Sequence, residues 1–363
     1  MSKNNTVYIG ENKKFWDRNR RSGGYLLKRR SGQIAISVVR ALLLFGLCFM
    51  IIQPLLTRFS LSLMSQEDLN DSTIILIPRH PSLESYSTVA AVNYVPESLI
   101  NALWVSFVVS ICQILSCTLV AYGFARYEFP LKKFWFACVV AVIIIPPQTI
   151  QTALYMNVMN FDVLRIFTLF GVNADGLNFG QRLMSIFDGT GTGLIRLFTG
   201  KAYNLRENIG AYIMMGLTCM GLKNGLYIYM MREYFKSIPT SLEEAAYVDG
   251  CGTMHTFVKI MLPDAFPTIA SCFLFSFVWQ WTDVFYSRIF LSGNFHFYAK
   301  EITGMLARLS TDATGRTTTT LPAGRRQQLV TVAVLICAIP PVILYLFTQR
   351  TFVESLAMSG SKE

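Results

Sequence analysis

Charged side chains are scarce in this chain of 363 residues. They make up 15% of the residues, against 52% hydrophobic residues, and the mean hydropathy is +0.41. Ordinary soluble domains carry about 25% charged residues, so this composition excludes that class of protein. The sequence therefore predicts a protein embedded in a lipid bilayer.

Histidine and paired cysteines are also scarce. The three histidines lie far apart in the sequence, and none of the eight cysteines belongs to a Cys-x-x-Cys pair. All the cysteines except Cys251 fall within apolar runs, so no disulfide framework is indicated. We expect no metal site in this chain.

The chain lacks the motifs of an enzyme or of a nucleotide-binding protein. It has no Ser-His-Asp constellation, and its glycine-rich stretch at 188–193 does not end in the Gly-Lys-Ser/Thr of a phosphate-binding loop. That stretch is more typical of a flexible turn. We expect no catalytic residue and no cofactor bound by the chain itself.

The positive charge is unevenly placed. The net charge is +10, and basic residues gather at 1–33, ahead of the first apolar run. A basic flank before a membrane span follows the positive-inside rule, which favours a cytoplasmic arm at 1–33 over nucleic-acid binding. The numbers of lysine and arginine residues in the later loops do not separate the expected inner loops from the expected outer loops, so they do not fix the orientation of the chain in the membrane.

Six apolar runs are long enough to cross a membrane at about 20 residues each. They lead us to expect an all-α integral membrane protein with six transmembrane helices, external loops at 57–97 and 287–327, and an external insert at 157–208. Cytoplasmic segments are expected at 232–265 and 348–363. The expected spans are 34–56, 98–124, 134–156, 209–231, 266–286 and 329–347.

Two spans contain adjacent prolines, at 146–147 and 340–341. Proline removes a backbone donor and bends or breaks a helix. The carbonyls freed in this way must be covered by protein or face water when they lie inside a membrane. The third span therefore either lines a cavity or simply bends.

Five residues of the second and fifth spans are candidates for a solute pathway: Asn101, Gln113, Trp279, Trp281 and Asp283. Polar groups at membrane depth indicate either hydrogen bonds between helices or a pathway. The two tryptophans either stack on sugar rings or belong to an interfacial aromatic belt. Both alternatives stay open for each type of residue.

The segment 232–265 is more polar than the apolar spans that flank it, and its composition is typical of a segment outside the membrane. Ser241 and Glu244 are three residues apart, which predicts a capping box at the start of a helix, and Gly250 predicts its end. A second short helix is expected from about Thr253 to Pro263. Since Ala245 is small, another protein could approach this helix closely.

The spacing of this segment resembles the complete EAA signature of permease subunits of ATP-binding-cassette (ABC) importers. Asp249, directly before Gly250, resembles the maltose-type branch that imports carbohydrates, as do Asn101 and the Ala-Tyr to Arg exit at 121–126. The resemblance covers residues 98–156 and 209–361. The residues to which it assigns coupling to an ATPase are Glu243, Glu244, Ala245, Ala246, Asp249, Gly250, Ile260, Leu262 and Pro263.

The resemblance implies a type I ABC importer permease fold, in which this segment couples ATPase closure to alternating access. It implies an ATPase dimer that binds ATP and magnesium, a second permease subunit in a heterodimer, an extracellular solute-binding protein and the lipid bilayer as partners. It further implies a bacterial inner membrane, cytoplasmic termini and a sugar or oligosaccharide as the solute.

Two features depart from the family pattern. The insert at 157–208 is much longer than the usual connection, and we expect it to contact the solute-binding protein; Thr282 replaces an asparagine that is common in the family. The alternative function is a secondary transporter or channel. It would need ionisable residues within spans, and the candidates Arg40, Lys223 and Asp283 are expected toward span ends.

Overall fold

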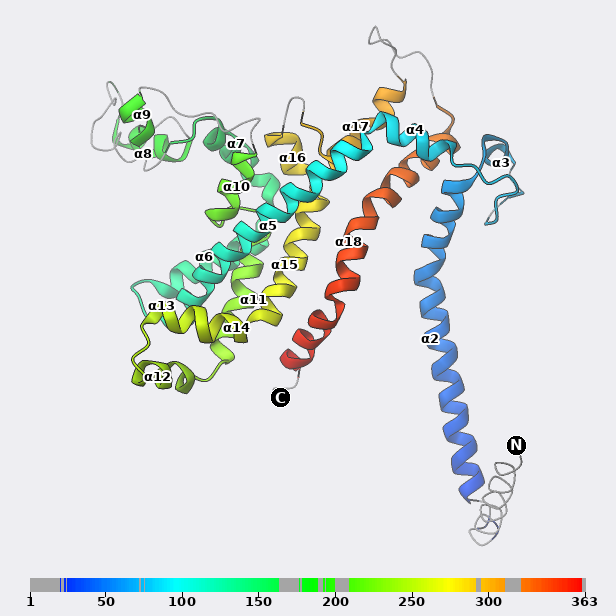
Figure 1. Ribbon diagram of the computed structural model, residues 1–363, viewed down its shortest axis with the longest axis horizontal. Helices are drawn as coiled ribbons and strands as arrows, with labels where there is room; N and C mark the ends of the chain where they lie inside the picture. Colours follow the sequence, from blue (N-terminus) through cyan, green and yellow to red (C-terminus); the bar gives the residue numbers. More distant parts are fainter. Residues whose placement is uncertain are drawn as a thin grey trace. The chain divides into compact units, whose positions relative to one another are not determined.

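A computed structural model describes Arg20, Gly23 and residues 25–360 except 72, 75, 163–175, 177, 189–191, 193, 200–208, 292–294 and 311–320. The regular elements within these residues are helices (Figure 1). They form two compact units, Met1–Leu83 and Glu84–Glu363. Most of the N-terminal arm and most of the glycine-rich stretch at 188–193 lie outside the described residues.

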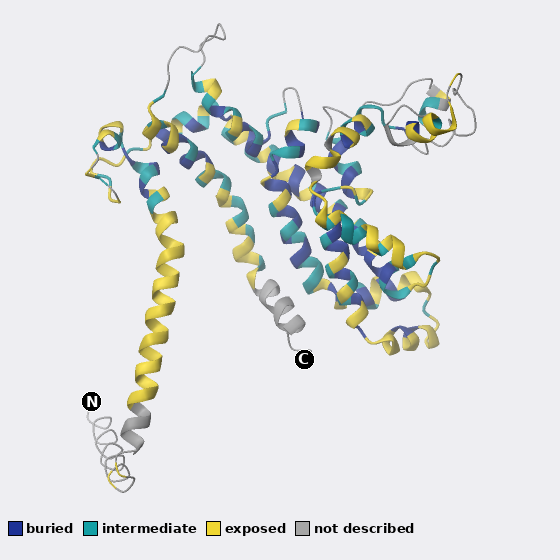
Figure 2. Cartoon of the chain, turned by 180° about the vertical axis from the view of Figure 1, so that it is seen from behind, coloured by how far each residue is buried: buried dark blue, intermediate teal, exposed yellow. Residues whose placement is uncertain are grey.

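The first unit consists of helices α2 (Tyr25–Leu63) and α3 (Gln66–Asn70) and the loop that follows them. Residues Ser31–Leu63 of α2 are long and apolar enough to cross a membrane. Figure 2 shows this helix exposed along most of its length. Exposed apolar side chains on a helix of this length suit contact with lipid.

Helix α5 (Val95–Arg126) is the centre of the second unit. Pro96 lies in its first turn and Arg126 in its last, which are the positions that these residues favour in a helix. Buried residues recur every three or four positions along it, as in Ala102, Val105 and Val109. This stripe packs against α10, α11 and α15.

The other helices of the second unit are shown in Figure 1, and several of them contact α5. They are α4 (Glu84–Val92), α6 (Lys132–Ile144), α7 (Gln151–Met159), α8 (Phe179–Asp188), α9 (Leu194–Thr199), α10 (Gly210–Leu217), α11 (Asn224–Ser237), α12 (Thr240–Val248), α13 (Thr253–Thr256), α14 (Leu262–Asp264), α15 (Phe266–Trp281), α16 (Phe285–Phe290), α17 (Tyr298–Ser310) and α18 (Ala323–Gly360).

Three helices among the described residues are individually long and apolar enough to span a membrane: Ser31–Leu63, Val95–Arg126 and Ala323–Gln349. Residues Thr253–Asp264 and Phe266–Trp281 qualify as a pair bent by 75°. The expected third and fourth spans are each divided into two helices, α6 with α7 and α10 with α11. The count of six crossings stays a prediction.

The two proline pairs behave differently. Helix α6 ends at Ile144 because Ile145, which precedes Pro146, adopts an extended conformation with ψ of 122°. By contrast, Pro340 and Pro341 lie inside α18, which continues to Gly360. Only the first pair divides its span.

Glycines let the broken fourth span approach its neighbours closely. A Cβ atom added to Gly225 of α11 would lie 2.7 Å from the carbonyl oxygen of Val139 in α6, which is closer than real Cβ atoms come. At Gly216 of α10 the corresponding distance, to the carbonyl oxygen of Val109, is 3.2 Å. Larger side chains at these two positions would therefore force α6 away from α11, and α5 away from α10.

Candidate functional site

Helix α12 and the turns after it form the segment that we call the coupling loop, residues 232–265. Helix α12 ends at Val248, and Gly250, two residues beyond it, has a φ of +81°, a conformation that favours glycine. The Cys251 amide donates to the Ala246 carbonyl at 2.9 Å, and the Gly250 amide donates to the Tyr247 carbonyl at 3.0 Å. This pair of bonds is a Schellman motif, so the expected terminator at Gly250 is confirmed.

The expected capping box at the other end of α12 is wrong. The helix begins at Thr240, its N-cap residue is Pro239, and no side chain caps it. Ser241 therefore lies inside the first turn, one position beyond the start, where its hydroxyl cannot serve as the N-cap acceptor.

Glu243 faces the protein rather than a free surface. Its Oε1 lies 3.2 Å from Arg126 Nε at the end of α5 and accepts a hydrogen bond from the Tyr122 hydroxyl at 3.1 Å. Arg126 also donates to the Ile238 carbonyl at 2.8 Å. Both members of the ion pair are about nine-tenths buried, with side chains 9% and 10% exposed. We call Glu243, Arg126 and Tyr122 the latch, because they join α12 to α5.

The coupling loop is also anchored by apolar side chains beyond α12. Phe257 and Met261, in the π-helical turn Phe257–Met261, are buried in the same core as Tyr122. The Tyr122 and Phe257 rings lie 4.6 Å apart, centroid to centroid. A movement of the coupling loop would therefore act directly on α5.

The opposite face of the coupling loop is open. Val248 is 87% exposed, Met254 is 68% exposed, and Leu242 and Tyr247 are about half exposed. Of the nine residues assigned to ATPase coupling, Glu243 and Ala246 are buried against this chain, Ile260 and Leu262 are partly buried, and Glu244, Ala245, Asp249, Gly250 and Pro263 are exposed.

A cavity of about 700 Å³ lies where the two broken spans meet the end of α15. Its wall includes the break after α6 at 145–146 and the short 3₁₀ helix η1 (Pro147–Ile150) that follows it. It also includes the break between α10 and α11 at 219–223, and Trp279, Thr282 and Asp283. Irregular backbone at membrane depth is stable where it lines a cavity, and discontinuous helices commonly form solute sites in transporters. The volume suits a small solute.

Two of the candidate pathway residues, Trp279 and Asp283, line the cavity, but only Trp279 exposes its side chain. Trp279 is 45% exposed and lines the cavity. Asp283 also contributes to the wall, but its carboxylate is buried and accepts hydrogen bonds from the Tyr212 hydroxyl at 2.6 Å and from the amides of 285, 286 and 287. Trp279 is therefore available to a solute, whereas Asp283 holds the turn after α15.

The other three candidates hold segments of the second unit together: Gln113 and Trp281 join helices, and Asn101 joins α5 to the loop before α17. Gln113 is buried, donates to the Leu222 carbonyl at 2.5 Å and to the Asn224 side chain, and accepts from Ser276 at 2.7 Å. The Asn101 amide donates to the His296 carbonyl at 3.1 Å. Trp281 is 1% exposed and donates to the Cys337 carbonyl at 2.9 Å. For these residues the structure supports helix contacts, and they are absent from the cavity wall.

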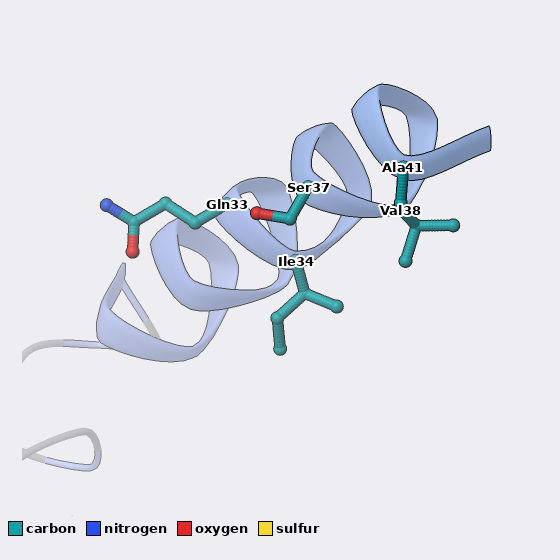
Figure 3. A pocket seen from close by; sticks show the side chains of 5 residues that line it. All are labelled: Gln33, Ile34, Ser37, Val38 and Ala41. Carbon is teal, nitrogen blue, oxygen red and sulfur yellow. The ribbon is translucent and has the colours of Figure 1, made fainter. Parts of the chain in front are cut away.

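A smaller hollow lies along α2 of the first unit. Figure 3 shows that Gln33, Ile34, Ser37, Val38 and Ala41 project from successive turns of this one helix. A second element is missing from the lining, so the hollow is part of a helix surface and is not built as a solute site.

Comparison with known proteins identifies the family. Residues 114–357, more than half of the chain, match the family described as the binding-protein-dependent transport system inner membrane component. The chain belongs to this family. It is therefore a membrane component of a binding-protein-dependent transport system.

Several curated permeases are similar to this chain over most of their lengths. A probable ABC transporter permease protein of Pyrococcus horikoshii is 28% identical, with 72% of this chain and 73% of the relative covered. An osmoprotective compounds uptake permease protein of Synechocystis is 26% identical, with 77% and 74% covered. The sn-glycerol-3-phosphate transport system permease protein of Salmonella typhi is 24% identical, with 92% and 99% covered.

A solved structure shows the same fold. It is a crystal structure of a bacterial ABC transporter involved in the import of the acidic polysaccharide alginate, with a TM-score of 0.59 and 17% sequence identity. The match covers 87% of this permease and 96% of the solved chain. The all-α ABC importer permease fold expected from the sequence is confirmed by this likeness.

Lys223 is a residue of the cavity wall that the sequence did not single out for the solute pathway. It was expected near the inner end of the fourth span, but it is the N-cap residue of α11, with a φ of 60°, and it lines the cavity. Cys219, in the same break, has a φ of 54°. Non-glycine residues rarely adopt this conformation, so the residue types at these two positions do not predict the break between α10 and α11.

Proposed function

We propose that this chain is one of the two permease subunits of an ABC importer. Its coupling loop binds an ATPase subunit, and a sugar or sugar derivative passes through its cavity. The observation that carries the proposal is the two-sided geometry of α12. One face holds Glu243 in the latch, while Val248 on the other face is exposed. A helix fixed to α5 on one side and open on the other suits the transfer of force from a partner.

The latch gives this transfer a physical route. A partner that displaces α12 pulls on the Arg126 guanidinium through Glu243, and Arg126 is the last residue of α5. Along α5, Gln113 is bonded to Leu222 in the α10–α11 break. Movement at the coupling loop would thus reach the cavity through one helix, and opening the cavity alternately to each side would move the solute.

The sugar class rests on the relatives and on the cavity. Two relatives are named for sugars, an alpha-glucoside transport system permease protein of Rhizobium meliloti and an arabinooligosaccharides transport system permease protein of Halalkalibacterium halodurans. Trp279 gives the cavity wall an exposed indole, and aromatic rings can pack against the C–H faces of sugars. A solute-binding protein would deliver the solute, and the insert at 157–208 is a candidate contact for that protein.

The orientation and the remaining partners follow from the coupling role. If a cytoplasmic ATPase dimer reaches α12, then the coupling loop is cytoplasmic, and six crossings place both termini on that side of a bacterial inner membrane. ATP and magnesium would bind to the ATPase. A second permease subunit would form the other half of the pathway, as a heterodimer.

The docking role is tested by Ala245→Arg, which adds a long cation to the exposed face of α12. The matched control is Ala307→Arg on the exposed side of α17. We expect Ala245→Arg to reduce the ATPase that copurifies with the permease, and Ala307→Arg to leave it at the wild-type amount. Equal ATPase recovery from both variants would exclude docking on this face.

A further inference from the structure

Lys223 is a cation in an unusual place. Helix α11 carries eight residues between Lys223 and the start of the coupling loop at 232, which is about 12 Å of helix, and the eight residues of α10 add about 12 Å on its other side. Figure 1 shows α10 and α12 at opposite ends of α11. Lys223 therefore lies within the expected fourth span rather than at an end of it.

Its charge lacks an acidic partner within the described part of the chain. The ammonium nitrogen lies 5.0 Å from the centroid of the Trp279 ring, and Lys223 belongs to none of the ion pairs there. The other charged residue of the cavity wall, Asp283, is occupied by Tyr212 and by backbone amides. An aromatic face attracts a cation but does not neutralise it.

The local backbone adds to the positive potential. Lys223 begins α11, so the positive end of the helix dipole lies at the same place on the cavity wall as the ammonium group. Charged side chains inside a membrane are costly, and they usually face a bundle interior or cavity where they serve function. Both contributions favour a negatively charged occupant.

We infer that the cavity binds the anionic group of its solute, a carboxylate or a phosphate, through Lys223, with Trp279 packed against the apolar face of the same molecule. This inference rests on the proposed function, because it takes the cavity to lie on the solute pathway. It narrows the solute from sugars in general to acidic sugars or sugar phosphates.

Cys219 provides a reporter for the charge of the cavity, since it lines the same wall in the same break as Lys223. The complete importer in detergent would be treated with an anionic and with a cationic methanethiosulfonate reagent, and modification of Cys219 would be followed by mass spectrometry. Cys219→Ser identifies the signal. We expect Lys223→Gln to lower the anionic-to-cationic rate ratio by about tenfold or more, and Lys223→Arg to keep it.

Competition distinguishes the class of solute. Glucuronate and glucose 6-phosphate should each slow the anionic reagent at Cys219, and their relative strength separates a carboxylate site from a phosphate site. Glucose, which shares the ring but lacks the charge, should not slow it. An unchanged rate ratio in Lys223→Gln, or equal protection by glucose, would overturn the inference and leave Lys223 as a structural contact of Trp279.

The result is separable from the proposed function. The rate ratio is measured without ATP hydrolysis, so it does not depend on docking at α12. Anion selectivity at Cys219 together with normal ATPase recovery from Ala245→Arg would keep the inference and reject the docking role. Reduced ATPase recovery from Ala245→Arg, together with a rate ratio at Cys219 that does not depend on Lys223, would keep the docking role and reject the inference.

Discussion

Breaking the latch should destabilise the permease and uncouple it from ATP hydrolysis. In Glu243→Gln the Arg126 guanidinium keeps its bond to the Ile238 carbonyl but loses the carboxylate 3.2 Å away. Removal of one partner from a buried ion pair costs about 3–5 kcal/mol, because the other charge stays buried without compensation. Since the Tyr122 hydroxyl can still bond to the amide, we expect about 3 kcal/mol.

The loss can be measured by unfolding the detergent-solubilised permease with a thiol-reactive fluorescent dye. Cys117 and Cys272 are fully buried, so they react when the helices separate. Glu244→Gln is the matched control, because Glu244 is the exposed neighbour of Glu243, and we expect it to cost less than about 0.5 kcal/mol.

A double-mutant cycle identifies the latch as the cause. Arg126→Met with Glu243→Leu removes both charges together, so the double variant should be more stable than the two single losses added, by about 0.5–3 kcal/mol. In liposomes, Glu243→Gln should hydrolyse ATP with reduced solute uptake for each ATP consumed. Additive single losses, or equal losses of stability in Glu243→Gln and Glu244→Gln, would refute the latch.

Two further predictions concern a turn and a loop. Gly250→Ala should destabilise the coupling loop by about 1 kcal/mol or more because its φ is +81°, whereas Gly252→Ala, at a φ of −74° with open space around it, should cost less; hydrogen exchange of the Cys251 amide measures both. In the first unit, the backbone amide of His80 donates to Asp68 at 2.9 Å and lowers the pKa of that carboxyl below its usual value. Because the folded-state pKa is depressed, this stabilisation is present above the unfolded pKa and is lost as the pH falls through the folded pKa, so the His80 amide should lose its hydrogen-exchange protection as the Asp68 carboxyl becomes protonated in acid; protection that stays constant through that titration would contradict this.

The sequence was informative where one residue type dictates a backbone conformation. Gly250 predicted the end of α12 because glycine takes a positive φ without strain. Pro146 predicted the division of the third span because the residue before proline avoids the helical conformation. The family resemblance rested on spacing in the same segment, and the family match confirms it.

The sequence alone did not reveal those environments that come from a distant segment. The sequence predicted that Glu243, like Glu244, faces a docking partner. In the structure Glu243 is buried against Arg126, which belongs to another helix far away in the sequence. The break between α10 and α11 that contains Lys223 could not be predicted, because Cys219 and Lys223 adopt positive φ values that their side chains do not favour. Tertiary packing decides both positions.

In the proposed importer, the exposed face of α12 receives the ATPase. A photo-crosslinking amino acid placed at Val248, which is 87% exposed, tests it directly in the assembled importer. Position Ile77, which is 79% exposed in the loop of the first unit, is the matched control. We predict a permease–ATPase crosslink from position 248 and none from position 77. No ATPase crosslink from 248, in a complex that contains the ATPase, would contradict the account.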